Sequence, residues 1–283
     1  MNRLPLVKRV AVVKALTEGN SIRATCRMTG VAKQTVFDLL ADLGPVCQAY
    51  QGAVLRDLSC ARIECDEIWA FCYAKNKNVP RAKRHLYAVG DVWTWAAFDP
   101  DSKLVVTWRV GKRTPDDAER FMADLASRLA RRIQLTTDGY SPYVTTVQLA
   151  FGKNVDFAQL VKEYARSTHN EERYSPAAIV KAEKHPVFGN PDEHTISTSG
   201  VERRNLTLRM ASRRFTRLTN GFSKKLVNLE NAVALHYLVY NFARRHGSLG
   251  GRTPAMAAGI ADHVWTFEEV IGLLNPERLV AAA

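Results

Sequence analysis

Three acidic residues carry the strongest chemical signal in this chain. Asp66 interrupts an apolar run, Asp138 directly follows a second apolar run, and Glu202 begins an arginine-rich segment. Three carboxylates that share a half-buried site repel one another strongly unless cations neutralise them. Oxygen ligands favour Mg²⁺ or Mn²⁺ over softer metals. We therefore expect these three residues to be catalytic metal ligands that hold two ions about 4 Å apart and cut a nucleic-acid backbone by in-line displacement.

Neighbouring acids are better explained by other roles. Strand alternation places Asp66 on one face and Glu67 on the other, so we expect Glu67 to help position the site rather than to bind metal. Asp99 and Asp101 belong to an Asp-Pro-Asp-Ser stretch that is typical of a hairpin turn. Asp91 follows a glycine inside a predicted strand and stays open as an alternative site residue.

The central part of the chain predicts strands and helices that would position these acids. Runs of β-branched and aromatic residues indicate strands at residues 62–73, 85–98, 103–110, 133–137 and 155–161. Thr114 and Pro115 are typical of a helix start, with a helix to Leu129, and a second helix is predicted at residues 141–151. The order βββαβαβα is that of the ribonuclease-H-like fold, an α/β class with a mixed sheet flanked by helices. Its first strand is covered on both faces, so an acid there needs a functional reason.

Residues 1–45 predict an all-α domain. Apolar residues at helical spacing indicate three helices, with Ser21 as a cap, Gly30 as a turn and the last helix at residues 32–43. The pattern is typical of a helix-turn-helix, in which the last helix directs its first side chains at DNA phosphates and base edges, here Lys33, Gln34 and Thr35. An ordinary three-helix packing unit is the alternative. Gly44-Pro45 predicts a helix break, followed by a linker or connecting helix at residues 46–60.

A dense group of basic residues follows Glu202. Because lysine and arginine gain affinity by releasing counterions from DNA, this segment predicts a phosphate-binding face, formed by Arg203, Arg204, Arg209, Arg213 and Arg214. A solvated charged helix is the alternative. Residues 226–242 then predict an amphipathic helix, for which core packing and a dimer seam are both open.

Composition limits the class of protein. The chain has 283 residues, 46% of them hydrophobic, and a net charge of +12, which favours a polyanionic partner such as nucleic acid. No apolar stretch approaches the roughly 18 residues that a membrane span needs, so we expect a cytoplasmic protein without a membrane partner. The five cysteines form no Cys-x-x-Cys pair and predict reduced, mostly buried thiols. His169, His185 and His194 lack metal-ligand spacing and favour a solvated loop.

Together these motifs resemble the DDE transposases of the insertion-sequence-one type. The matching stretches span residues 62–240 in the family's order: Asp66-Glu67-Ile68-Trp69, Phe98-Asp99-Pro100-Asp101-Ser102-Lys103, Thr137-Asp138-Gly139-Tyr140, Glu202 to Arg209, and Phe222-Ser223-Lys224-Lys225. The resemblance implies that Asp66, Asp138 and Glu202 form a catalytic triad and that Arg209 contacts the transposon end. It also implies double-stranded DNA as the partner, both as transposon ends and as target, and at least a homodimer when two ends are brought together.

Three features depart from the family. The zinc finger typical of its N-terminus is absent, residues 162–198 form an insertion of open role, and residues 246–283 form a tail beyond the resemblance. The catalytic domain is accordingly expected at residues 61–245.

Three functions follow as hypotheses. The first is a transposase that binds terminal inverted repeats, cleaves at their ends and transfers 3′ hydroxyls to target DNA. The second is a structure-specific, Mg²⁺-dependent nuclease of the resolvase kind. The third is a non-catalytic DNA-binding repressor.

Overall fold

A six-stranded mixed sheet forms the centre of the computed structural model, which describes residues 4–164, 179–216 and 219–275. The strands are β1 (Arg62–Cys72), β2 (Gly90–Phe98), β3 (Val105–Gly111), β4 (Ile133–Thr137), β5 (Val155–Tyr164) and β6 (Ile179–Phe188). Their order is β3-β2-β1-β4-β5-β6, with β1 antiparallel to β2 and parallel to β4. The predicted α/β class with a mixed sheet is confirmed, and the chain follows the predicted order of elements through β5, after which β6 is an additional strand.

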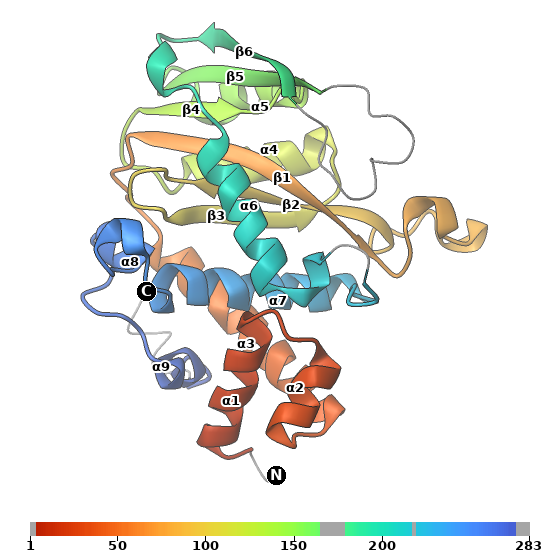
Figure 1. Cartoon of the computed structure of the whole chain (residues 1–283). Helices are drawn as coiled ribbons and strands as arrows, with labels where there is room; N and C mark the ends of the chain where they lie inside the picture. The colour runs from red at the N-terminus through yellow and green to blue at the C-terminus, as the bar shows by residue number, and fades with distance from the viewer. Residues whose placement is uncertain (1–3, 165–178, 217–218, 276–283) are drawn as a thin grey trace.

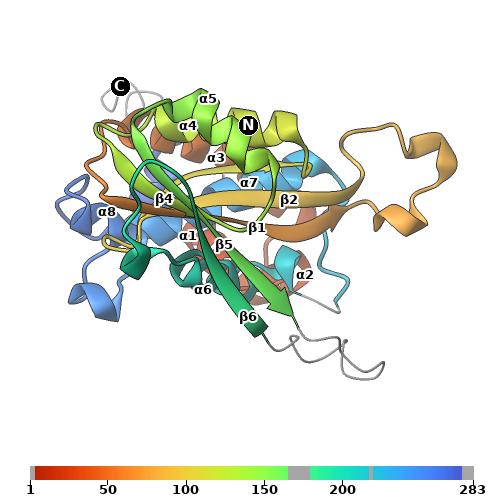
Figure 2. The same cartoon turned by 90° about the horizontal axis from the view of Figure 1, so that it is seen from above.

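Helices cover both faces of this sheet. Helices α4 (Pro115–Ala126) and α5 (Pro142–Phe151) lie on one face and α6 (Ser199–Ala211) on the other, as Figures 1 and 2 show. The Thr114 hydroxyl accepts a hydrogen bond from the Asp117 amide at 3.3 Å, and Pro115 is the first residue of α4. Threonine and proline therefore start this helix as predicted, although it ends at Ala126 instead of Leu129.

Three helices precede the sheet: α1 (Leu6–Thr17), α2 (Ile22–Thr29) and α3 (Lys33–Val54). We call α1, α2 and the first turns of α3 the N-terminal helical unit. Ser21 caps α2 by accepting from the Ala24 amide at 3.1 Å, and Gly30 ends that helix with φ 68°. Left-handed backbone of this kind suits glycine, so both sequence signals act as predicted.

The predicted helix break at Gly44-Pro45 is wrong, because α3 continues through Pro45 to Val54. A proline inside a helix costs about 3 kcal/mol. The C-terminal half of α3 offsets this cost by burying Leu43, Cys47 and Gln51, and the helix lies against α7 (Leu226–Leu238). Residues 46–54 are therefore the connecting helix, not an open linker.

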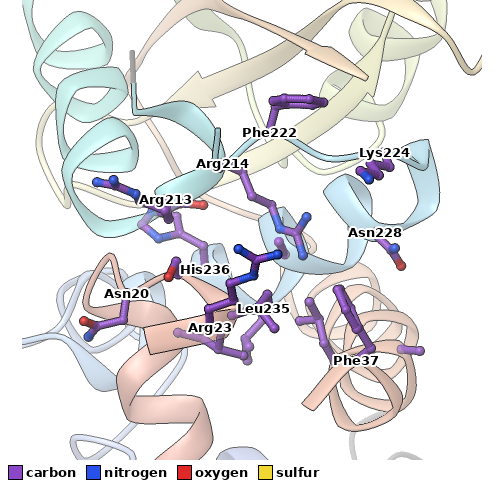
Figure 3. A pocket seen from close by; sticks show the side chains of 18 of the residues that line it. Asn20, Arg23, Phe37, Arg213, Arg214, Phe222, Lys224, Asn228, Leu235 and His236 are labelled. Atoms are coloured by element: carbon purple, nitrogen blue, oxygen red, sulfur yellow. The ribbon is translucent and has the colours of Figure 1, made fainter. Parts of the chain in front are cut away.

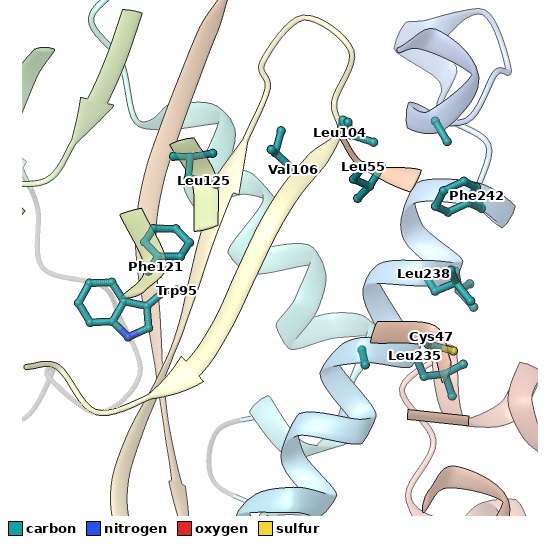
Figure 4. Close-up of a cluster of buried hydrophobic side chains, with 14 of the residues drawn as sticks. Cys47, Leu55, Trp95, Leu104, Val106, Phe121, Leu125, Leu235, Leu238 and Phe242 are labelled. Atoms are coloured by element: carbon teal, nitrogen blue, oxygen red, sulfur yellow. The ribbon is translucent and has the colours of Figure 1, made fainter. Parts of the chain in front are cut away.

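One hydrophobic core links the helical unit to the sheet. Its buried side chains extend from Val12 in α1 through Cys47 in α3 and Leu235 in α7 to Trp95 and Phe121 between the sheet and α4. Figure 4 shows part of this cluster. The amphipathic residues 226–242 are buried within the monomer, in α7 and the π-helical turn Val239–Ala243, so core packing explains them.

An exposed segment at residues 73–89, here called the β1–β2 arm, projects from one end of the sheet (Figures 1 and 2). The strand predicted to begin at residue 85 begins instead at Gly90. The arm is closed at its base by Asn76 and Asp91, because each side chain accepts a hydrogen bond from the other residue's amide, at 2.9 and 3.2 Å. Asp91 therefore has a structural role at the far end of β2.

Of the predicted insertion at residues 162–198, the described part includes the end of β5 and strand β6, which extend the sheet. Strand β6 pairs antiparallel with β5, and His185 lies in this strand rather than in a loop. His169 and residues 165–178 lie outside the described residues. In the predicted tail, α8 (Pro254–Ala257) and α9 (Phe267–Gly272) follow α7 and its π-helical turn, and α9 packs on α1. Within the described ranges, no helix combines the length and apolarity of a membrane span.

Candidate metal centre

Strand register brings Asp66 and Asp138 to the same level of the sheet. In the parallel pair, Glu64 of β1 faces Thr136 of β4. The same offset of two residues places Asp66 opposite Asp138, which follows the last residue of β4. Because β1 continues to Cys72 while β4 has ended, the space beyond β4 is free for side chains at this strand end. Carboxyl ends of parallel strands are a common position for ligand sites.

Three carboxylates meet at this point. Oxygen atoms of Asp66, Glu67 and Asp138 lie within 4.8 Å of one another, and we call this set the acidic cluster. Glu67 does project to the opposite face from Asp66, as predicted, because its carboxylate accepts a hydrogen bond from Tyr143 of α5. Its oxygen nevertheless reaches the cluster, so Glu67 qualifies as a candidate ligand as well as a positioning residue.

The acidic cluster is electrostatically strained. Burial, and then the neighbouring Asp138, raise the pKa of Asp66 to about 6. Burial and Asp138 likewise raise the pKa of Glu67 to about 8, against the opposing effects of Tyr143 and Arg113. Desolvation and like charges both disfavour the ionised form, and a bound cation would relieve both effects.

Arg113 supplies positive charge to the cluster. It lies between β3 and α4, and its guanidinium binds Glu67 Oε2 through Nε at 3.1 Å and Asp138 Oδ2 through Nη2 at 2.7 Å. The guanidinium also stacks on Tyr140, with 4.3 Å between its carbon and the ring centroid. One arginine thereby bridges two of the three acids and competes with any cation for Asp138 Oδ2.

Two contacts fix α6 against β1. The buried carboxylate of Glu64 accepts from the Val201 amide at 2.9 Å, so it satisfies a free backbone donor in the first turn of α6. Asn205 donates from Nδ2 to Asp66 Oδ2 at 2.8 Å. The Asn205 Oδ1 atom is buried without a hydrogen-bond partner, which leaves an unused oxygen acceptor beside Asp66.

Glu202 lies near the cluster without joining it. Its charge contributes to the raised pKa of Asp66, but it is not one of the three residues whose oxygens lie within 4.8 Å. Glu202 Oε1 instead accepts from Thr198 Oγ1 at 2.7 Å and forms an ion pair with Lys162 of β5. Its carboxylate is accordingly neutralised by lysine, as Asp138 is by arginine.

Of the eight predicted DNA-binding side chains, three are exposed, four are partly buried and one is buried. Lys33 and Gln34 are exposed at the start of α3, Thr35 is partly buried, and Arg203 is exposed on α6. Arg209 is partly buried in the last turn of α6. The basic segment is not one continuous helix, because α6 ends at Ala211 and a 3₁₀ turn at Arg213–Phe215 holds the next two arginines. Arg217 lies outside the described residues.

Arg204 corrects the predicted basic face. It is 2% exposed, and its guanidinium stacks on Tyr240 and Tyr237, with 3.8 and 4.8 Å to the two ring centroids. Two positions separate Arg204 from Glu202, which turns it by about 200° around the helix. The side chain therefore enters the core and offers no phosphate contact.

Several residues of the site escaped sequence reasoning. Asn205 follows Glu202 by three positions, so helical spacing could have indicated it. Glu64 lies two positions before Asp66 on the same strand face, so strand alternation could have indicated it. Arg113 and Lys162 had no local signal, because each reaches its acid from a different element. The hairpin role of Asp99 is confirmed, since its carboxylate accepts from Asp101 and Ser102.

Models of known protein families give no match to this chain, and no curated protein matches it in sequence.

Proposed function

We propose that this chain is a DNA transposase that cleaves the ends of its element and transfers the 3′ hydroxyls to target DNA. The observation that carries the proposal is the convergence of Asp66 and Asp138 at one strand end, with α6 delivering Glu202 nearby. Asp66 and Asp138, which are 72 positions apart in the sequence, meet as a metal-dependent phosphodiester site requires, and Glu202, 64 positions further along, lies nearby.

The side chains of this centre fit a divalent cation that prefers oxygen. Asp66, Asp138 and Glu67 offer three carboxylates, Asn205 Oδ1 has no partner, and the pKa values of Asp66 and Glu67 are raised. We expect Asp66 and Asp138 to hold a pair of Mg²⁺ or Mn²⁺ ions together with Glu202 or Glu67. These ions would activate a water or 3′ hydroxyl and stabilise the leaving oxygen. Arg113 and Lys162 would then release or share their carboxylates.

The fold supports the same class. The order β3-β2-β1-β4-β5, with only β2 antiparallel to its two neighbours, and helices on both faces are features of a ribonuclease-H-like domain. We assign residues 61–245 to that domain. We further assign α2 and α3 as a helix-turn-helix, because Lys33 and Gln34 are exposed at the start of α3.

The proposed partner is double-stranded DNA. The chain has a net charge of +12. The exposed side chains of Lys33 and Arg203 would contribute to a phosphate-binding surface. Joining two ends of one element requires two active sites, so we propose a homodimer or larger assembly in the DNA-bound state.

A cleavage and strand-transfer assay tests the proposal. Purified protein would be incubated with Mg²⁺ and labelled duplexes that carry the inverted repeats flanking the reading frame. We expect nicks at the repeat ends and joined products, both reduced at least about 100-fold in Asp138→Asn, because loss of a ligand removes the metal chemistry. Asp116→Asn is the matched control, since Asp116 is an exposed acid on α4 that pairs with Arg120.

Three outcomes would contradict the proposal. Cleavage that persists in Asp138→Asn would remove the metal centre from the mechanism. Preferential cutting of four-way junctions over repeat ends would replace the transposase with a structure-specific nuclease, and repeat binding without any cleavage would favour a repressor.

A further inference from the structure

A large basic cavity lies between part of the N-terminal helical unit and the segment that leads into α7. Its volume is about 1020 Å³, and it lies between α2 and α3 on one side and the segment from the 3₁₀ turn to α7 on the other. Figure 3 shows side chains from both walls directed into this space. The acidic cluster does not line it, so the cavity is distinct from the candidate metal centre.

The described lining of this cavity is strongly positive. Its cationic side chains come from both walls and are Arg23, Lys33, Arg213, Arg214, Lys224 and Lys225. The one carboxylate of the described lining, Asp38, accepts a hydrogen bond from Gln34 at 2.7 Å. Burial and the nearby Arg204 hold the pKa of His236 well below its usual value, so this lining residue is uncharged. No ion pair is found for the six cations among the described residues.

Arg214 is the one described cation of this lining with a buried nitrogen that lacks a hydrogen-bond partner. Its Nη1 atom donates to Ser223 Oγ at 2.6 Å, whereas its Nη2 atom is buried without a hydrogen-bond partner. Burial lowers the pKa of its guanidinium to about 10. Figure 3 shows Arg23 of α2 pointing toward Arg214 from the opposite wall. Two guanidinium groups that face each other without a carboxylate repel, and an anion between them would remove the repulsion.

We propose that this cavity binds the sugar-phosphate backbone of DNA, with a phosphate held between Arg23 and Arg214. Guanidinium groups bind phosphate oxygens through N–H donors, and the buried Nη2 of Arg214 has such donors without a partner. The space exceeds what one phosphate needs, and Lys33, Lys224 and Lys225 add further positive charge to its lining for the neighbouring phosphates of a backbone. The inference rests on the proposed function for the identity of the anion as DNA.

The site would connect two DNA contacts of the molecule. Lys33 and Gln34 line the cavity and also begin α3, whose first residues are the proposed base readers. A backbone held by Arg214 therefore belongs to the same DNA segment that α3 contacts. Phosphate contacts of this kind set register and orientation without reading sequence.

Equilibrium binding without Mg²⁺ tests this site. Fluorescence anisotropy would follow labelled duplexes of two unrelated sequences in EDTA, with the full chain as wild type, Arg23→Gln, Arg214→Gln and Arg27→Gln. Arg27 is the matched control, because it is an exposed arginine on the same helix as Arg23 and does not line the cavity. We expect each cavity variant to weaken binding about tenfold for both sequences. The slope of log affinity against log salt should also fall by about 1.

The outcomes separate this site from the proposed function. Equal affinities of Arg23→Gln, Arg214→Gln and Arg27→Gln would overturn the site while leaving DNA binding intact, and absence of DNA binding by the wild type would contradict both. Inorganic phosphate should displace DNA no better than chloride of equal ionic strength, since stronger displacement would identify a small-anion site instead. Thermal denaturation checks folding, and exposed Arg23 carries the test if Arg214→Gln is unstable.

Discussion

Asp66 and Glu67 are adjacent in β1 and project to opposite faces of the sheet, yet the carboxylate of Asp138 raises the pKa of both. Asn205 contacts the first from α6, and Tyr143 contacts the second from α5. Asp138 contributes to the raised pKa of both residues, and Asp66 also raises the pKa of Glu67, so Asp66 and Glu67 titrate as a coupled pair. In the metal-free protein, holding these carboxylates ionised and close together costs free energy. Cation binding requires the ionised carboxylates, so it depends on pH.

The metal-free protein should lose stability as pH rises. The folded pKa values of about 6 for Asp66 and about 8 for Glu67 exceed the usual 3.8 and 4.5, so the folded chain binds more protons than the unfolded chain. The free energy of unfolding therefore falls from about pH 5 to about pH 8. Mg²⁺ should bind more tightly over the same rise in pH, because its ligands must be deprotonated. Thermal denaturation in EDTA and calorimetric Mg²⁺ titration measure the two effects.

The double variant Asp66→Asn, Glu67→Gln is the control for this pH dependence. Its metal-free stability should change much less across the same pH range, since both raised groups are gone. A wild-type melting temperature that rises between about pH 6 and about pH 8 in EDTA would contradict the assigned pKa directions.

At the scale of elements, one buried side-chain amide pairs with the backbone of the edge strand β3. Asn241, in the π-helical turn after α7, accepts from the Val105 amide at 3.0 Å and donates to the Val105 carbonyl at 3.0 Å. It also donates to Gln51 of α3 at 3.3 Å. A single buried amide thus satisfies both backbone groups that β3 presents at this point, which a neighbouring strand would otherwise do.

Asn241→Leu should destabilise the protein by about 2–4 kcal/mol, because it leaves the buried Val105 amide and carbonyl without partners. Chemical denaturation followed by tryptophan fluorescence measures this change. Asn78→Ala is the control, because Asn78 is exposed in the β1–β2 arm, and its effect should stay within about 0.5 kcal/mol. Equal stabilities of the two variants would show that the amide contacts contribute little.

Across the whole molecule, α3 and α7 hold the N-terminal helical unit and the sheet together. The two helices approach closely at Gly44, where a Cβ atom would collide with the side chain of Asn231. The Asn231 Cβ atom is attached to the α7 backbone, so the collision is relieved only if the helices move apart. Gly52 lies eight residues further along α3 with no atom near its Cβ position.

These two glycines give a matched test of the helix contact. Gly44→Ala should destabilise the protein by about 1–3 kcal/mol through overpacking. Gly52→Ala should stabilise it by about 0.5–1 kcal/mol, because alanine favours the helix and meets no obstacle. Denaturation midpoints of both variants measure the difference, and a stabilising Gly44→Ala would disprove close packing of α3 on α7.

Local patterns predicted much of this protein. Apolar alternation located the strands, cap residues such as Ser21 and Thr114 located helix starts, and two aspartates of the centre followed from their places in apolar runs. These signals are readable because each depends on residues within one or two turns or one strand. The helix break at Gly44-Pro45 failed for the opposite reason, since burial against α7 outweighs the local cost of proline.

The sequence by itself therefore determined the α/β class, the chain order of elements through β5 and the positions of Asp66 and Asp138 at one end of the sheet. Only the tertiary structure decided that Glu67 joins them, that Arg113 and Lys162 neutralise the acids, and that Arg204 is buried while Arg214 lines a cavity. The physical reason is that periodicity assigns a side chain to a face, whereas its partners depend on how separate elements pack against that face.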